Sequence, residues 1–248
     1  MNNNLKQAQN IMLDILKEVD KICKKHNINY WLDSGTLLGA IRHGGFIPWD
    51  DDLDISMSID DYYKFIQIAQ SELPLHMKLQ TKEIEKEFPY DFAKIRDNHG
   101  KIIEQHEKDN NVSYNQGIFI DIIPVIFIDD SYIYKTLYKL NFLAIKLFSY
   151  KYLNIYKIRK LLIYMHDKMH NIKNNVVIRS GKFPSYLLYL NKKSIFPLKK
   201  MQFENYNFNI PNKPNDYLNV LYGNSFMRLP PKEKQHTHAF KIETFKEK

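Results

Sequence analysis

Aspartates gather in one short stretch of this chain, "IPWDDDLDIS", between residues 47 and 56. Asp50, Asp52 and Asp54 are spaced two apart, so on an extended strand their side chains would leave the same face, about 6 to 7 Å apart. Carboxylates this close repel one another unless a cation lies between them. Oxygen ligands without His or Cys favour Mg²⁺ or Mn²⁺ over zinc. The spacing therefore predicts a divalent-cation site, with Asp51 on the other face.

Glycines precede this cluster, and four of the chain's eight lie between residues 30 and 56. The segment "LDSGTLLG" places Gly35 between the hydroxyls of Ser34 and Thr36, and "TLLGAIRH" then has helical spacing. The first backbone amides of such a helix would face a phosphate. We expect Ser34, Gly35 and Thr36 to contact a phosphate of the substrate.

Three well-known acidic motifs fit this stretch less well. An EF-hand needs a glycine where this chain has Ile55, and a glutamate where it has Asp61. A haloacid-dehalogenase-like phosphatase needs a buried strand before the nucleophile, but "HGGFIPWD" is a loop sequence. A D-x-D glycosyltransferase needs a nucleotide-binding half before the motif, and too few residues precede it.

The remaining chain predicts a mixed α/β (α+β) fold. A helix is expected to end near residue 26, and further helices over 36–43 and 61–73. Strands are expected over 28–33, 53–58, 76–82, 91–97 and from 117 to near Pro124. This order is not the regular alternation of a doubly wound fold. We expect a catalytic core over 1–130, a basic amphipathic helical segment over 131–200, and a C-terminal segment over 201–248 that packs on the core.

Whole-chain properties limit the function classes. The net charge of +8 suggests a polyanionic neighbour, and the basic helical segment either has solvated lysines or contacts an anionic membrane surface. Cys23 is the only cysteine, so an intramolecular disulfide and a multi-thiolate zinc site are excluded. We see no signal peptide, no apolar run of about 18 residues and no nucleic-acid-reading motif. A cytoplasmic protein, soluble or peripheral at the inner face of the membrane, is expected.

The order of motifs resembles a known fold and family. A Gly-Ser or Gly-Thr turn, a D-x-D strand and a later acid, here Asp121 in "GIFIDIIP", are typical of nucleotidyltransferase-fold enzymes. "GTLLGAIRHGGFIPWDDDLDISM", "FAKIRDNHGKIIE", "GIFIDIIPV" and "YLNVLYGNSFMRLPP", in this order, look like the LicD family of phosphocholine transferases and its fukutin-type relatives. The resemblance runs from the first helix to about Pro231.

This resemblance implies transfer of phosphocholine from CDP-choline, or of a similar alcohol phosphate, to a hydroxyl of a cell-surface glycan, with CMP leaving. The acceptor would be a lipopolysaccharide, teichoic acid or capsule precursor, which is in some cases lipid-linked. Asp52, Asp54 and Asp121 would be catalytic and would hold Mg²⁺ or Mn²⁺, and Asp50 would support them without binding the metal. One ion is expected, and a second is left open.

Other residues are candidates for substrate contacts. Arg42, Lys94 and Arg96 are the cations best placed for the donor, because Arg42 extends the Gly-Thr helix while Lys94 and Arg96 share one face of "FAKIRD". A surface ion pair is the competing role for each of them. Trp49 would stack on cytosine or close the site, but a core aromatic has the same sequence signature.

Two further functions stay open at this point. The first is a nucleotidyltransferase that moves the nucleotide, rather than the alcohol phosphate, onto a hydroxyl. The second is a catalytically inactive protein that binds a membrane surface. The presence of all three expected acids argues against a decayed active site.

Overall fold

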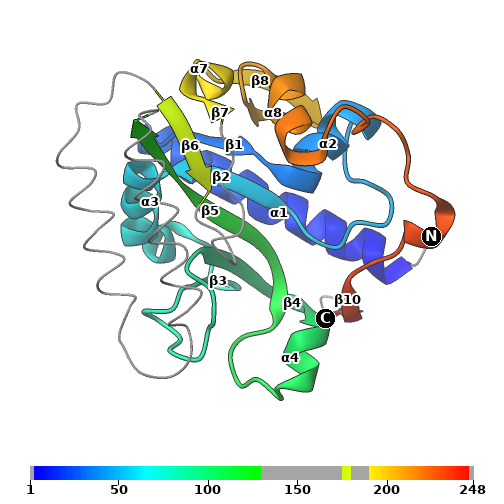
Figure 1. Ribbon diagram of the computed structural model, residues 1–248. Coiled ribbons are helices and arrows are strands. Elements are labelled where there is room, and N and C mark those ends of the chain that lie inside the picture. Colours follow the sequence, from blue (N-terminus) through cyan, green and yellow to red (C-terminus); the bar gives the residue numbers. More distant parts are fainter. Residues whose placement is uncertain (1–2, 130–174, 180–189, 246–248) are drawn as a thin grey trace, which may run out of the picture.

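The computed structural model describes residues 3–129, 175–179 and 190–245 (Figure 1). An eight-stranded sheet forms its centre, with the order β1-β2-β5-β4-β10, β3 also paired with β4, β6 with β5, and β7 with β6. These strands are β1 (Tyr30–Leu32), β2 (Asp54–Ser58), β3 (Met77–Gln80), β4 (Ala93–Glu104), β5 (Gly117–Asp129), β6 (Asn175–Arg179), β7 (Leu190–Asn191) and β10 (Ala239–Thr244). The pair β2–β5 is parallel and the other pairs are antiparallel, so the predicted mixed α/β class is confirmed.

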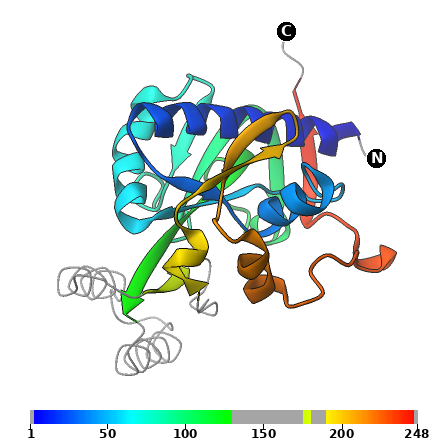
Figure 2. The same ribbon diagram turned by 90° about the horizontal axis from the view of Figure 1, so that it is seen from above.

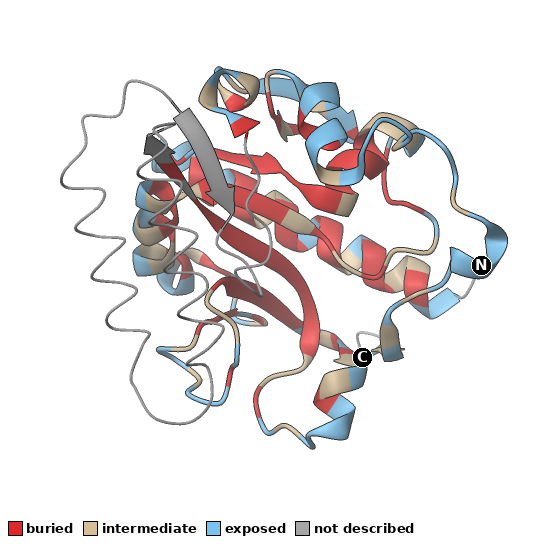
Figure 3. Cartoon of the chain, in the orientation of Figure 1, coloured by how far each residue is buried: buried red, intermediate tan, exposed pale blue. Residues whose placement is uncertain are grey.

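Two helices, α1 (Asn3–Lys25) and α3 (Ile59–Glu72), cover one face of this sheet (Figures 1 and 2). The apolar side of α1 repeats at helical spacing, with Ala8, Met12 and Leu16 fully buried. Strand residues such as Ile55 and Ile122 are also fully buried, and Figure 3 shows buried residues in the middle of β2 and along the first part of β5. Removal of this apolar surface from water is what holds α1 on the sheet.

Smaller elements complete the described fold. They are α2 (Ser34–His43), α4 (Gln105–Asp109), α7 (Lys192–Ile195), α8 (Pro214–Tyr222), a 3₁₀ turn η1 (Lys232–Lys234), and a hairpin of β8 (Lys199–Phe203) with β9 (Tyr206–Ile210). The α2 helix packs against β2, α8 and β8. It ends at Gly44, whose φ of 71° favours glycine.

The sequence-predicted elements of the first 130 residues are all present, but β5 is longer than expected. It continues past Pro124 to Asp129 because the apolar run continues and β6 offers a partner for Val125–Asp129. Proline at 124 does not end the strand, which pairs there with Met57 of β2.

The segment expected to be a basic helical region, 131–200, lies mostly outside the described residues. Its described part contains the strands Asn175–Arg179 and Leu190–Asn191 and the short helix Lys192–Ile195, so the helical prediction for 131–174 stays a prediction. Two valines and an isoleucine follow one another in "NVVIR", and such β-branched residues favour strands. The β8–β9 hairpin and β10 were not expected. The central sheet therefore takes strands from all three predicted segments of the chain.

Candidate functional site

Two of the predicted catalytic acids are neighbours across the parallel strand pair. Asp54 of β2 lies in register with Asp121 of β5, which places both side chains on one face of the sheet. Lys94 of β4 is in register with Asp121 on its other side, and its Nζ lies 2.8 Å from Asp121 Oδ1. The same Nζ lies 3.6 Å from Glu104 Oε2. Segments far apart in the chain thus bring two acids and a fully buried lysine together.

Asp50 and Asp52 reach this region from a loop, not from a strand. The expectation of three same-face aspartates on one strand was wrong, because β2 begins only at Asp54. Before it, the Asp50 backbone N–H donates to Ile47 O at 3.0 Å across Pro48, which forms a turn. Gln9 of α1 holds this loop in place, because its side-chain amide donates to Ile47 O at 3.3 Å and to Asp50 O at 2.9 Å.

The electrostatics of the loop acids show crowding of like charges. Burial first, and then the carboxylates of Asp54 and Asp51, raise the pKa of Asp50 to about 7. Burial first, and then Asp50 and Asp121, raise the pKa of Asp52 well above its ordinary value, although the Lys94 ammonium opposes this. Asp50 and Asp52 are both partly exposed to solvent. A cation among these carboxylates would remove the repulsion.

The donor set fits a hard divalent cation, because every ligand atom offered is a carboxylate oxygen. The carboxylate oxygens of Asp52, Asp54 and Asp121 are, however, farther from one another than the ligand atoms of an occupied metal site. Within the described ranges, three groups have ligand atoms all within 4.8 Å of one another: Asp50/Asp51/His238, His76/Asp97/His99 and Glu104/His106/Glu107. An ion held by all three predicted ligands would therefore require their side chains to turn inward.

Asp51 holds the C-terminal strand against the acidic loop. Its buried carboxylate accepts hydrogen bonds from the backbone N–H of His238 at 3.0 Å and of Ala239 at 2.5 Å, where β10 begins. These are charge-assisted bonds, which are stronger than neutral ones. Asp51 is therefore a structural member of the acidic run.

The Ser-Gly-Thr turn packs directly on the acids. The Thr36 hydroxyl accepts the backbone N–H of Asp54 at 2.8 Å, which fixes the start of β2. A Cβ on Gly35 would lie 2.8 Å from Asp50 Oδ2, so a larger residue would displace this carboxylate from the N-terminus of α2. Ser34 is buried with a φ of 47°, a left-handed conformation that is costly for serine and common at functional sites. Their contact with a phosphate stays a prediction.

A buried aspartate that sequence reasoning missed organises this turn. Asp33 is fully buried and caps α2, where its Oδ1 accepts the N–H of Ser34 at 2.6 Å. Tyr217 of α8 donates its hydroxyl to the same oxygen at 2.9 Å, and Ser56 Oγ of β2 donates to Asp33 Oδ2. Trp31 Nε1 donates to the Tyr217 hydroxyl at 3.3 Å. The signal available in the sequence was an aspartate directly before a helix, which is a favoured N-cap.

The predicted cations differ in position. Arg96 shares a face with Lys94; both side chains are fully buried and lie over the Phe119 ring. Its guanidinium donates to Gln80 Oε1 at 2.8 Å, to Gly117 O at 2.9 Å and to Glu107 Oε1 at 3.2 Å. Arg96 thus belongs to an interior network in which the buried Glu107 supplies the counter-charge. Its expected contact with the donor stays a prediction.

Comparison with known proteins identifies the family. Residues 27–153, about half of the chain, match the family model described as "LicD/FKTN/FKRP, nucleotidyltransferase domain". The chain belongs to the LicD family. It is 29% identical to the lipopolysaccharide cholinephosphotransferase LicD of Haemophilus influenzae, over 94% of this chain and 95% of that protein. The LicD-family recognition made from the motifs is confirmed, and the chain is a transferase.

Shorter similarities reach two groups of LicD-family relatives in mammals. The human ribitol 5-phosphate transferase FKRP is 44% identical over 45 residues, which cover 18% of this chain and 9% of that protein. The mouse ribitol-5-phosphate transferase FKTN is 33% identical over 79 residues, which cover 32% of this chain and 17% of that protein. The part shared with these mammalian enzymes is therefore short.

Arg42 and Trp49 complete the description of the LicD-family site. Arg42 Nη1 donates to Phe226 O at 3.1 Å and to Arg228 O at 3.3 Å, so it ties α2 to the loop after α8. Trp49 is partly buried against the core and meets His43 edge to face, with ring centroids 6.1 Å apart. Among the helices that the structure describes, none is long and apolar enough to cross a bilayer.

Proposed function

We propose that this LicD-family chain transfers phosphocholine, or a similar alcohol phosphate, from a CDP-activated donor such as CDP-choline to a hydroxyl of a cell-surface glycan. The observation that carries the proposal is the register of Asp54, Asp121 and Lys94 on adjacent strands beside the loop acid Asp52. The similarity to a lipopolysaccharide cholinephosphotransferase over nearly the whole chain supports the choice of donor and acceptor.

The acids fit a Mg²⁺ or Mn²⁺ cofactor by their chemistry. Asp52, Asp54 and Asp121 would hold the ion, and Asp50, seated against Gly35, would support them. When bound, the ion neutralises the pyrophosphate charge of the donor. The crowding that raises the pKa values of Asp50 and Asp52 in the metal-free protein is the physical reason for a cation there.

The reaction follows from the chemistry of phosphoryl transfer. The acceptor hydroxyl oxygen attacks the phosphorus that bears choline, and the bond from that phosphorus to the bridging oxygen breaks, so CMP leaves with the electron pair. The hydroxyl proton has to pass to a base. We assign Asp121 to the acceptor hydroxyl as base or positioning group, because Lys94 holds its Oδ1 at 2.8 Å and fixes the orientation of the carboxylate.

The remaining substrate contacts belong to the same proposal. Ser34 and Gly35 in the first turn of α2, and Arg42 in its last turn, would meet the donor. Trp49 is the partly buried aromatic residue nearest in sequence to the acids, and it would stack on the cytosine ring of the donor or close the site. A net charge of +8 suits an anionic, lipid-linked acceptor at the inner face of the cell membrane.

CMP release from CDP-choline labelled in its choline tests this function, with candidate glycans as acceptors. We expect label in the glycan and a rate at least about 10³-fold lower in Asp52→Asn and Asp54→Asn, because the ion contributes several kcal/mol. Asp14→Asn changes an exposed carboxylate on α1 and is the matched control. Activity of both site variants within tenfold of wild type would overturn the assignment of these acids.

Two labelled donors, one with the label in its choline and one with the label in its cytidine, separate alcohol-phosphate transfer from nucleotidyl transfer. If the nucleotide were transferred, a label in the cytidine would enter the glycan and the choline label would stay in solution. That result would replace the proposed reaction with the nucleotidyltransferase alternative.

A further inference from the structure

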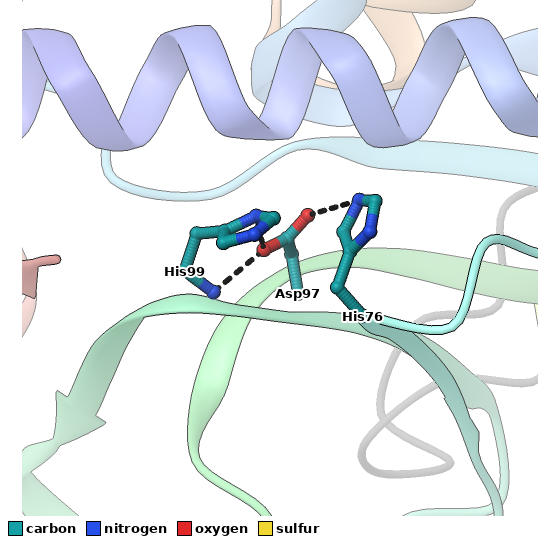
Figure 4. Close-up of side chains that lie close together, drawn as sticks. All are labelled: His76, Asp97 and His99. Atoms are coloured by element: carbon teal, nitrogen blue, oxygen red, sulfur yellow. Dashed lines mark hydrogen bonds and ion pairs between the residues drawn. The ribbon is translucent and has the colours of Figure 1, made fainter. Parts of the chain in front are cut away.

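Two histidines and a buried aspartate converge at a second place on the sheet. His76 lies in the turn before β3, while Asp97 and His99 belong to β4 (Figure 4). His99 Nδ1 is 2.9 Å from Asp97 Oδ1, and His76 Nε2 is 3.5 Å from Asp97 Oδ2. We propose that these three side chains form a binding site for a transition-metal ion of the Zn²⁺ class, separate from the aspartate cluster.

The spacing of the ligand atoms supports this proposal. In tetrahedral zinc sites, metal–ligand distances of about 2.0–2.2 Å place neighbouring ligand atoms roughly 3.3 Å apart. The three potential ligand atoms here all lie within 4.8 Å of one another. Small rotations about the side-chain bonds of the two imidazoles would bring all three onto one ion.

The ligand types select a different metal from the aspartate cluster. Imidazole nitrogens suit Zn²⁺, Co²⁺, Ni²⁺ and Cu²⁺, whereas carboxylates alone suit Mg²⁺ and Mn²⁺. A set of two imidazoles and one carboxylate leaves room for water in the remaining position. The two sites would therefore bind different ions from the same solution.

The surroundings hold the ligands in place and leave an entry path. Asp97 is 3% exposed, while the side chains of His76 and His99 are 39% and 36% exposed. The backbone N–H of His99 donates to Asp97 Oδ1 at 2.7 Å, which orients the carboxylate. The backbone of His76 is fixed by the N–H of Asn98, which donates to His76 O at 3.1 Å, and Phe245 N–H donates to His99 O at 2.6 Å.

The His76/Asp97/His99 site lies away from the catalytic acids. Asp97 is three residues beyond Lys94 along β4, about 10 Å at the rise of a strand, and the alternation of side chains places it on the other face. An ion bound there would join the turn before β3 to β4 and, through the backbone of Phe245, to the end of β10. It would act as a structural clamp and not in the transfer reaction.

Titration of the full chain with Co²⁺ in excess Mg²⁺ tests the proposal, because Mg²⁺ occupies the all-carboxylate site while Co²⁺ reports imidazole ligands by its absorption. We expect saturation at one equivalent, and an affinity lower by at least about 100-fold in the double variant His76→Asn/His99→Asn. The control His26→Asn changes another part-exposed histidine that is paired with a carboxylate, and should bind as wild type.

A second measurement does not depend on the fold of a variant. X-ray absorption of the cobalt-loaded wild-type protein should show two imidazole ligands. Absence of Co²⁺ binding, equal binding by the double variant, or a cobalt ion without two imidazoles would each overturn the proposal, and His76, Asp97 and His99 would then be a hydrogen-bonded network only.

Discussion

Asp50 allows a direct test of the electrostatics of the aspartate cluster. Burial, and then the neighbouring Asp54 and Asp51, raise its pKa to about 7, whereas an aspartate in an unfolded chain has a pKa of about 3.9. Between these values the folded state keeps a proton that the unfolded state has released. The free energy of unfolding of the metal-free protein therefore falls as the pH rises through this interval, and the loss is complete above about pH 7.

The size of the effect follows from the shift. Roughly three pKa units at about 1.4 kcal/mol each give about 4 kcal/mol, and solvent screening of a partly open carboxylate reduces this to a range of about 2 to 4 kcal/mol. Asp50→Asn removes the charge and keeps a similar shape. We expect it to stabilise the metal-free protein by this amount at pH 8 and by much less at pH 5.

Urea unfolding in the presence of a chelator, at pH 5 and at pH 8, measures the difference. The matched control Asp14→Asn changes an exposed carboxylate paired with Lys17 and should shift stability by less than about 1 kcal/mol at either pH. If Asp50→Asn followed the wild-type protein at both pH values, the claim that repulsion and burial destabilise the empty cluster would be refuted.

Three other predictions concern residues that position the site. Asp51→Ala leaves two backbone N–H groups at the start of β10 without their acceptor and should lower the free energy of unfolding by about 3 kcal/mol. Hydrogen exchange at Ala239 should become faster, and an unchanged exchange rate would contradict the structural role of Asp51. Tyr217→Phe removes the hydroxyl that donates to Asp33 and should lower the free energy of unfolding by about 1 to 3 kcal/mol, and no loss would show that the bond contributes nothing. Cys23 is buried with a raised pKa, so a thiol reagent should react with it only as fast as the protein unfolds, and rapid native-state labelling would be inconsistent with this burial.

Local patterns in the sequence were sufficient for the elements that carry the acids. Helical periodicity predicts α1, and alternation with β-branched residues predicts β2 and β5. The pairing of Asp54 with Asp121 could be expected once both strands were placed, because a D-x-D strand followed by a later acid resembles a known fold. The loop conformation of Asp50 and Asp52 could not, since three alternating acids fit a strand equally well.

Long-range partners account for most of what the sequence did not reveal. Tyr217 and Asp33 are separated by 184 positions, and nothing near either residue indicates the other. Arg96 has the same sequence signature as a substrate-binding cation, and its interior role depends on Glu107, which arrives from α4. The strand β10 was missed because its residues do not alternate strongly between apolar and polar. It is positioned by long-range contacts, namely its pairing with the edge of β4 and the hydrogen bond from Ala239 N–H to Asp51.

The central claim is that Asp52 and Asp54 bind the cation that holds the donor. Isothermal titration of CDP-choline into the wild-type protein, with Mg²⁺ and with a chelator, and into the double variant Asp52→Asn/Asp54→Asn tests it most directly. Binding that requires Mg²⁺ and is lost in the double variant, while Asp14→Asn binds normally, is the predicted result. Equal binding with a chelator, or equal binding by the double variant, would contradict the account.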